Sequence, residues 1–406
     1  MPETIHQSNQ LGQMNLPGQI DQIFVTALHW LVGHLPAAVQ PAASAVVSVA
    51  AIVIVFALLF AITTVLERKG LGRIQNRYGP NRVGPCGFFQ PIADGVKSLT
   101  KEDIVPRTAD QLVHFLSPVL LVMAAFLAYA VLPIGRNMVL VNLNAGVLYF
   151  FAVGSLVELS VFMAGWSSRN KYSLLGAMRA IAQMISYEVP LVLASVVVLM
   201  AAGSLSTVSI VDMQAGYSGI WPHWFLFTPW GFAGFILFMI AATAESNRSP
   251  FDLPEGESEI IAGYYIEYSG FKFALFFLGE YLGMFATSAM AITLFLGGWA
   301  APFSFLKWIP SYLWFFAKLL VLIAGFIWIR GTLPRLRMDQ LMNFAWQFML
   351  PMTLINIFVA GVWHFMPTGL WRWLLCAVLL VVPCILLAGS LKQGKAVEVR
   401  KYRFAD

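Results

Sequence analysis

The chain is poor in charged residues. Only 11% of its 406 residues are Asp, Glu, Lys or Arg, against about 25% in ordinary soluble domains. Hydrophobic residues make up 59% and aromatic residues 14%, and the mean hydropathy is +0.75. This composition excludes an ordinary soluble domain and is typical of a polytopic membrane protein. We therefore expect an all-α fold, a bundle of transmembrane helices with amphipathic surface helices.

Residues that hold metals and cofactors are scarce or wrongly spaced. The three cysteines, Cys86, Cys376 and Cys384, form no CxxC pair, so neither a zinc site nor an iron–sulfur cluster is indicated. None of the six histidines lies near the middle of a predicted span, which excludes a pair of axial haem ligands. A glycine-rich nucleotide loop is also absent. We expect this chain to bind no NAD, flavin or metal itself.

Targeting signals and repeats are lacking as well. The N-terminus has no basic segment followed directly by an apolar core, and it is not rich in arginine, so we expect neither a signal peptide nor a transit peptide. No repeat of 20–50 residues is evident. The net charge of +5 does not indicate a nucleic-acid partner, because the basic residues are sorted by loop.

Apolar runs long enough to cross a bilayer core of about 30 Å follow one another along the chain. A helical pattern over residues 20–35 is too short and polar to span and predicts an interfacial helix. Residues 88–102 predict a second amphipathic surface helix, opened by Pro91. We predict nine spans, the fifth being the shortest: 45–66, 112–132, 145–166, 181–202, 230–245, 271–296, 311–329, 348–365 and 371–390.

Lys and Arg residues predict the orientation of these spans. They concentrate in the loops after spans one, three and seven and in the tail, whereas the opposite loops offer little beyond Arg136, Lys307 and Arg372. The N-terminus is therefore expected outside and the C-terminus inside. We divide the chain into an outer N-terminal extension with the interfacial helix, a main membrane domain, an additional C-terminal span and a basic tail: 1–44, 45–366, 367–390 and 391–406.

Carboxylates inside the spans are costly, at about 2.5–3.5 kcal/mol each for a charged group at a helix centre. Counted from the inner ends of their spans, Glu158, Glu188 and Glu280 lie about 12, 10 and 13 Å deep. Glu245 lies near the inner surface. Acids at one depth on three helices favour a lateral proton relay. The alternative is pairing with a base that locks helices together, but only Lys318 lies well inside a span, away from its ends, and it is in the outer half.

A second group of acids, Glu255, Glu257 and Glu259, follows Pro254 in a loop. Proline can begin a helix, and acids in a first helical turn are stabilised by the helix dipole. These carboxylates can therefore be purely structural. From their spacing alone, an acidic vestibule leading towards the buried glutamates is an equally good interpretation.

Three motifs identify a known family. They are ERK at 67–69 with RYGPNRVGP at 77–85, QPIADGVK at 90–97, and AESNRSPFDLPEGESE at 244–259. Together they resemble the H subunit of respiratory complex I, the proton-pumping NADH:quinone oxidoreductase, and the likeness covers roughly residues 45–365. The N-terminal extension and the ninth span are absent from mitochondrial members, which favours a bacterial inner-membrane protein.

The resemblance implies that the chain encloses much of a quinone tunnel and couples quinone reduction to proton movement. Quinone is then its substrate, while NADH, FMN and iron–sulfur clusters belong to partner subunits. The expected partners are the peripheral-arm subunits at the quinone site and the iron–sulfur clusters, adjacent small membrane subunits and lipids.

The resemblance also assigns roles to individual residues. The implied relay runs from Glu255, Glu257 and Glu259 to the glutamates in or beside the spans, Glu245, Glu188, Glu158 and Glu280. The implied quinone-chamber residues are Arg68, Arg77, Arg82, Asp94, Arg248 and Tyr281. By sequence alone, these arginines equally suit topology and headgroup contacts, and the helix at 88–102 equally suits resting on the membrane.

Other interpretations remain open. The corresponding subunit of a membrane-bound hydrogenase, a formate hydrogenlyase or a dehydrogenase of a reduced deazaflavin would share this fold. A stand-alone ion transporter is disfavoured because the chain shows no inverted repeat and no matching Gly/Pro-broken spans. An inert anchor would not explain acids at matched depth.

The orientation is directly testable. A reporter fused after Asp406 should be active only in its cytoplasmic form, because the positive loops place the C-terminus inside. A reporter that is active in the periplasm would contradict both the count of nine spans and the matched depth of the glutamates.

Overall fold

In a computed structural model the chain is a helical bundle with one two-stranded hairpin among the described residues, 21–37, 39–252, 262–367 and 369–392. The all-α fold class is confirmed. The first half contains α3 (Ile23–Gly33), α4 (Gln40–Ile74), α5 (Gln90–Thr100), α6 (Gln111–Ala128), α7 (Gly146–Ser167), α8 (Lys171–Ala202) and α9 (Thr207–Gln214). The second half contains β1 (Tyr217–Ser218), β2 (Trp221–Pro222), α10 (Pro229–Glu245), α12 (Gly270–Phe295), α13 (Ser311–Thr332), α14 (Met338–Asn343), α15 (Leu350–Phe365) and α16 (Leu370–Lys392).

Every predicted span corresponds to a helix, and both predicted surface helices are present as α3 and α5. Eight described helices are long and apolar enough to cross a membrane. The fifth predicted span, α10, has 17 residues, which rise about 26 Å and fall short of a bilayer core of about 30 Å. Its crossing of the membrane therefore stays a prediction.

Two helices extend well beyond the predicted spans. The 35-residue α4 continues through the polar residues 67–74, and the 32-residue α8 begins ten positions before its apolar run. Hydropathy marks only the part of a helix that suits lipid, so these polar turns were missed. The added turns of α4 contain Glu67 and Arg68, which lie beyond the predicted first span.

The eighth span is continuous from Met338 to Phe365 but contains a π-helical segment at Phe344–Met349. Pro351 follows directly, near the start of α15. A proline has no N–H for the carbonyl four residues earlier, so the helix widens here without breaking.

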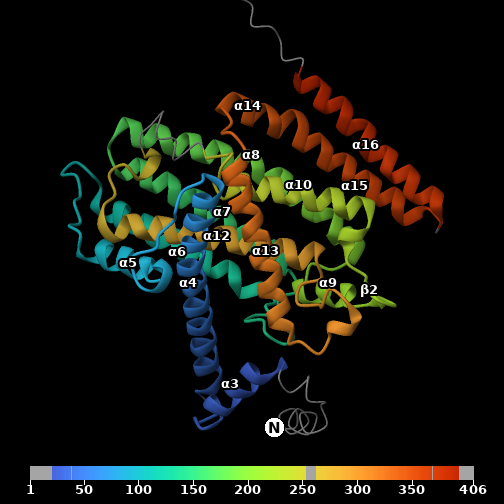
Figure 1. The fold of residues 1–406 in the computed structure, drawn as a ribbon, viewed down its shortest axis with the longest axis horizontal. Helices are drawn as coiled ribbons and strands as arrows, with labels where there is room; N and C mark the ends of the chain where they lie inside the picture. The colour runs from blue at the N-terminus through green and yellow to red at the C-terminus, as the bar shows by residue number, and fades with distance from the viewer. Residues whose placement is uncertain (1–20, 38, 253–261, 368, 393–406) are drawn as a thin grey trace, which may run out of the picture.

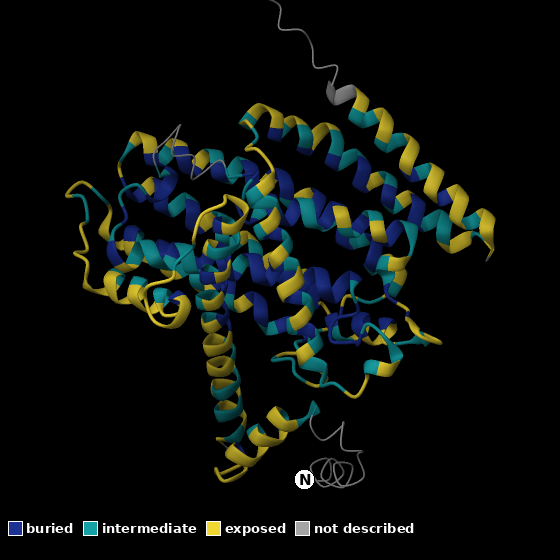
Figure 2. Cartoon of the chain, in the orientation of Figure 1, coloured by how far each residue is buried: buried dark blue, intermediate teal, exposed yellow. Residues whose placement is uncertain are grey.

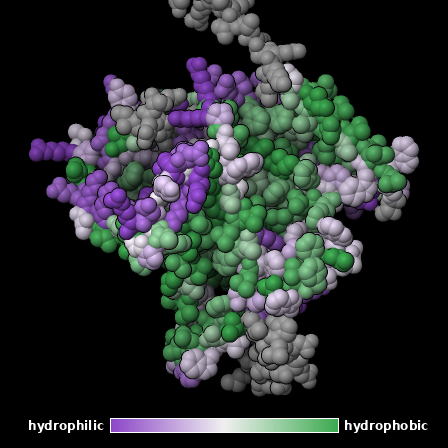
Figure 3. All heavy atoms as spheres, viewed as in Figure 1, coloured by the Kyte–Doolittle hydropathy of each residue, from purple (hydrophilic) through white to green (hydrophobic). Residues whose placement is uncertain are grey.

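Helix α12 forms the centre of the bundle, where every residue from Tyr281 to Phe295 is buried except Gly283. In Figure 2 the dark blue buried residues concentrate in α8, α10 and α12, whereas α4 and α16 are largely exposed. Figure 1 shows α4 leaving the bundle and α15 and α16 lying side by side at its edge. In Figure 3 hydrophobic residues cover α4 and α13, and hydrophilic ones gather around the segment between α4 and α6.

Buried polar side chains fasten the helices through backbone carbonyls. Gln183 Nε2 of α8 donates to the carbonyls of Ala244 and Phe251, both at 2.7 Å, and so holds the chain that leaves α10. Gly176 lets α8 approach the 3₁₀ turn η4 (Gly263–Tyr265), since a Cβ there would lie 2.7 Å from Gly263 Cα. These contacts place the segments on either side of 253–261 against α8.

Lys318 of α13 has a structural role. Its Nζ donates to the carbonyls of Leu296, Gly298 and Ala300 at 2.7–2.8 Å, just past the end of α12. Buried backbone carbonyls need a donor, and one ammonium group donates to three carbonyls of the segment that follows α12. Lys318 therefore binds backbone carbonyls and does not neutralise the buried glutamates.

Candidate functional site

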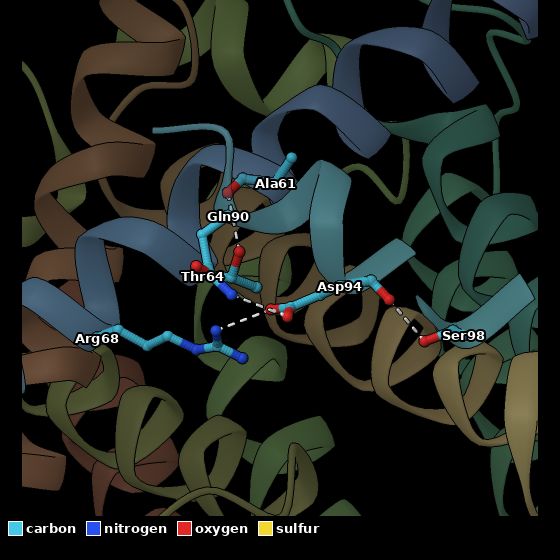
Figure 4. A network of polar contacts seen from close by, with 6 residues as sticks. All are labelled: Ala61, Thr64, Arg68, Gln90, Asp94 and Ser98. Atoms are coloured by element: carbon cyan, nitrogen blue, oxygen red, sulfur yellow. Dashed lines mark hydrogen bonds and ion pairs between the residues drawn. The ribbon is translucent and has the colours of Figure 1, made fainter. Parts of the chain in front are cut away.

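A pair of charged residues joins α4 to the surface helix α5. Arg68 Nη1 of α4 lies 2.8 Å from Asp94 Oδ2 of α5, and Gln90 Nε2 donates to the other carboxylate oxygen at 3.0 Å (Figure 4). The two charged side chains are 52% and 40% exposed. Two of the predicted chamber residues are thus brought together, in a contact that water can reach.

A buried ionic cluster, centred on the carboxylate of Glu67, joins the C-terminal parts of α4 and α13 to the middle of α12. The Tyr281 hydroxyl of α12 donates to Glu67 Oε2 at 2.5 Å, and Arg330 of α13 donates to Oε1. Arg248 Nη1, from the loop after α10, lies 3.8 Å from the same Oε1. The side chains of Glu67 and Arg248 are only 7% and 10% exposed.

Arg248 is held between the Glu67 carboxylate and the Tyr281 ring. Its guanidinium stacks 3.8 Å from the centre of the Tyr281 ring, a cation–π contact. Burial opposes its charge, but Tyr281, Glu67 and Glu280 outweigh burial and raise the pKa of Arg248, so it stays charged. Its Nε and Nη2 are buried and have no hydrogen-bond partner among the described residues. They can therefore donate to an acceptor brought into the site.

The loop that carries Arg248 turns sharply after α10. Asn247 adopts φ 50°, a left-handed conformation that asparagine tolerates better than most residues. The backbone N–H groups of Asn247 and Arg248 then bond to carbonyls of the last helical turn, those of Ala244 and Thr243. This turn points the chain back towards α4 and α12.

Glu280 of α12 belongs to the surroundings of this cluster. It interacts electrostatically with Arg248, and the buried Tyr264 donates to its Oε1 at 2.9 Å. Tyr264 lies in η4, which packs on α8. Glu280 therefore stands between the ionic cluster and the helix that carries Glu188.

A separate cluster of carboxyl groups joins α7, α8 and α10. Glu158 and Glu188 share a side-chain hydrogen bond, and both interact electrostatically with Glu245. Glu245 Oε2 is buried and has no hydrogen-bond partner among the described residues. A carboxylate can only accept, so a hydrogen bond between two carboxyl groups requires that one of them carries a proton.

An apolar cavity of about 650 Å³ lies behind the loop of Arg248. Its walls come mainly from α10 and α13, and Pro250, Phe251 and Phe344 close it. No titratable side chain lines it among the described residues. Any described side chain that exchanges protons therefore lies outside this cavity.

Comparison with known proteins identifies the family of this chain. Residues 47–361 match the family model described as NADH dehydrogenase. Proteins from Burkholderia ambifaria and Burkholderia vietnamiensis, each named as the H subunit of NADH-quinone oxidoreductase, are 46% identical over 337 residues, which covers 82% of this chain and 94% of each relative. The protein of the same name from Paraburkholderia xenovorans is 45% identical over 336 residues, covering 82% and 95%. The chain belongs to the NADH dehydrogenase family. The predicted resemblance to the H subunit is confirmed.

The structure divides the predicted site of this NADH dehydrogenase family member into separate groups. Glu158, Glu188 and Glu245 form one group, whereas Glu280 interacts with Tyr264 and Arg248. Equal depth did not show which helices face one another, so the predicted single row appears here as two groups. The relay itself stays a prediction.

Other predicted site residues lie elsewhere. Arg77 and Arg82 are exposed in the loop between α4 and α5, where Arg77 donates to Gln75 at 2.7 Å. Neither is part of the buried cluster around Glu67. Three predicted relay residues, Glu255, Glu257 and Glu259, lie outside the described residues.

Sequence reasoning missed Glu67 and Arg330 as site residues. Glu67 was noted only as the first letter of a motif, and Arg330 only as a basic loop residue that predicts orientation. A usable signal existed, because each lies one residue beyond the predicted inner end of its span. A charged residue at that position can lie buried against a neighbouring helix instead of reaching the headgroups.

The buried cluster should be far more sensitive to substitution than the exposed pair. Glu67→Gln leaves the buried guanidinium of Arg248 and the partly exposed one of Arg330 without their carboxylate, and it should destabilise the protein by about 3–5 kcal/mol. Asp94→Asn, in the exposed pair, should cost less than about 1 kcal/mol. Thermal unfolding of the purified complex, followed by tryptophan fluorescence, compares them.

A double-mutant cycle separates the ion pair from general packing damage. Glu67→Gln combined with Arg330→Gln should cost clearly less than the two single substitutions added together, because the second removes a charge that the first left unpaired. Additive losses, or equal effects of Glu67→Gln and Asp94→Asn, would show that the cluster is not energetically coupled.

Proposed function

We propose that this chain is the membrane subunit of a bacterial, proton-pumping NADH:quinone oxidoreductase that encloses part of the quinone tunnel and couples quinone reduction to proton translocation. The observation that carries the proposal is the position of Glu280, between the buried guanidinium cluster and the helix of the hydrogen-bonded carboxyl pair. The guanidinium cluster can respond to a new charge beside it, and the carboxyl pair can hold and release a proton.

The quinone side of the mechanism rests on Arg248. Reduction of a quinone to a quinol adds two electrons and two protons, so negative charge develops on the carbonyl oxygens until protons arrive. Arg248 offers a fixed positive charge and two donors, Nε and Nη2, that have no partner in the described part of the chain, to such an oxygen or to an intervening water. Glu67, Tyr281 and Arg330 hold the guanidinium in place.

The surface helix α5 forms the outer part of the proposed tunnel. The Arg68–Asp94 pair fixes α5 against α4, and Arg77 and Arg82 present positive charge on the exposed loop between them. Exposed charge here suits contact with peripheral-arm subunits, which would supply electrons from NADH through FMN and iron–sulfur clusters. This chain would bind quinone and lipid but no redox cofactor of its own.

The proton side rests on the glutamates. New charge beside Arg248 weakens the attraction between Arg248 and Glu280, and the protonation of Glu280 changes in response. The change then passes to the interacting pair Glu158 and Glu188 and to Glu245 beside them. Glu255, Glu257 and Glu259 would lead protons towards Glu245 and Glu280 from the chamber.

The names of the relatives favour this proposal over a subunit of a hydrogenase or formate hydrogenlyase, since each is named as the H subunit of an NADH-quinone oxidoreductase. The buried clusters themselves would suit either complex. Identification of the subunits that copurify with the chain separates these possibilities and also tests the stand-alone transporter.

The relay predicts a specific loss of activity. Glu188→Gln keeps the shape and hydrogen bonding of a protonated glutamate but cannot ionise. In a relay it should abolish proton pumping and slow NADH-to-quinone turnover by at least tenfold, because the two processes are coupled. Glu280→Gln should act alike, and the double variant should be little worse than either single one.

The matched control is Glu102→Gln, an exposed glutamate between α5 and α6. It should pump and turn over normally. All variants must be compared in membranes where a native gel shows assembled complex. Assembled Glu188→Gln complex that pumps at the wild-type rate would refute an obligatory relay through this residue.

A further inference from the structure

A second cavity, of about 640 Å³, lies at the opposite end of α10 from Glu245. It is enclosed where the C-terminal ends of α8 and α15 meet the N-terminal ends of α10 and α16, close to β2 (Figure 1). Trp230, at the start of α10, is 15 residues or about 22 Å from Glu245. The cavity is thus separate from the ionic and carboxyl clusters.

The basic residue of this cavity is Arg372, in the first turn of α16. Its guanidinium lies 3.7 Å from the centre of the Trp363 ring, and Trp363 packs edge-on against Trp373 at 5.1 Å. The Nε atom of Arg372 is buried and has no hydrogen-bond partner among the described residues. Trp230 Nε1, on the cavity wall, is a second buried donor without a partner in that part of the chain.

The electrostatics of the cavity favour an anion. A helix N-terminus is positive, so Arg372 at the start of α16 meets a field of its own sign. His223 and His364 also line the cavity, and none of its described lining residues is an acid. A negatively charged group between Arg372 and the helix end would relieve the repulsion and accept the unused hydrogen bond.

The remaining wall suits a lipid. Met200, Ala201 and Ala360 are apolar, and a Cβ added at Gly361 would meet nothing within 4 Å, so the space continues beside that glycine. Tryptophan rings such as Trp363 and Trp373 concentrate at headgroup depth in membrane proteins. The positive loops place this end of the bundle on the outer side of the membrane.

We propose that this cavity binds an anionic phospholipid of the outer leaflet. The phosphate accepts from Arg372 Nε, and an acyl chain lies along the apolar wall formed by α8 and α15. The lipid thereby joins the first turn of α16, which is otherwise largely exposed, to the rest of the bundle.

Lipid retention in the purified complex tests this site. The complex is delipidated, incubated with vesicles of phosphatidylglycerol or of phosphatidylcholine, repurified and analysed by native mass spectrometry. Wild type should retain phosphatidylglycerol in preference to phosphatidylcholine. Arg372→Gln should lower the retained phosphatidylglycerol about tenfold, as expected for loss of a charged hydrogen bond. Arg136→Gln, a basic residue of another loop on the same side, should retain it as wild type does.

A second variant keeps the test independent of charge and of folding around Arg372. Gly361→Leu fills the open space and leaves Arg372 in place, and it should also lower retention. Wild-type retention in both Arg372→Gln and Gly361→Leu would overturn the proposal. Equal retention of the two lipids by wild type would overturn it as well. Displacement of the lipid by millimolar inorganic phosphate would identify a free-phosphate site and contradict a lipid.

Discussion

The geometry of the candidate site depends on one carboxylate, that of Glu67. Three side chains from three other parts of the chain contact it. Tyr281, Arg330 and Arg248 all approach it within the protein interior. Removing such charges from water costs several kcal/mol per ion, and only close, well-formed contacts offset that cost. The cluster therefore does more to specify a geometry than to stabilise the fold. It determines where the loop of Arg248 lies relative to α4, α12 and α13.

That geometry connects two kinds of chemistry. Arg248 is charged and held between Glu67 and the Tyr281 ring, and two of its donors have no partner among the residues that the structure describes. Glu280 lies within its electrostatic reach and receives a hydrogen bond from Tyr264, on the turn that packs against α8. A change of charge at Arg248 therefore has a short physical route to the helix of Glu188. In the proposed mechanism this route couples quinone reduction to proton transfer.

The sequence predicted what depends on local pattern. Apolar runs located the helices, and the amphipathic period located α3 and α5, because each is a property of neighbouring residues. The contact between Glu67 and Arg248 joins positions far apart in the chain and depends on how helices pack, which no local pattern records. Depth along a span likewise gives only one coordinate of a residue. It does not say which helices are neighbours. It predicted one row of Glu158, Glu188 and Glu280 and did not show that Glu280 lies apart from the other two.

The central claim is that the protonation of Glu158 and Glu188 changes when quinone is reduced. Infrared difference spectroscopy of the complex, recorded as bound quinone is reduced, measures it through the C=O stretch of protonated carboxyl groups. The account predicts a carboxyl difference band in wild type that is lost in Glu188→Gln and retained in Glu102→Gln. A wild-type spectrum without such a band, or a band unchanged in Glu188→Gln, would contradict the account.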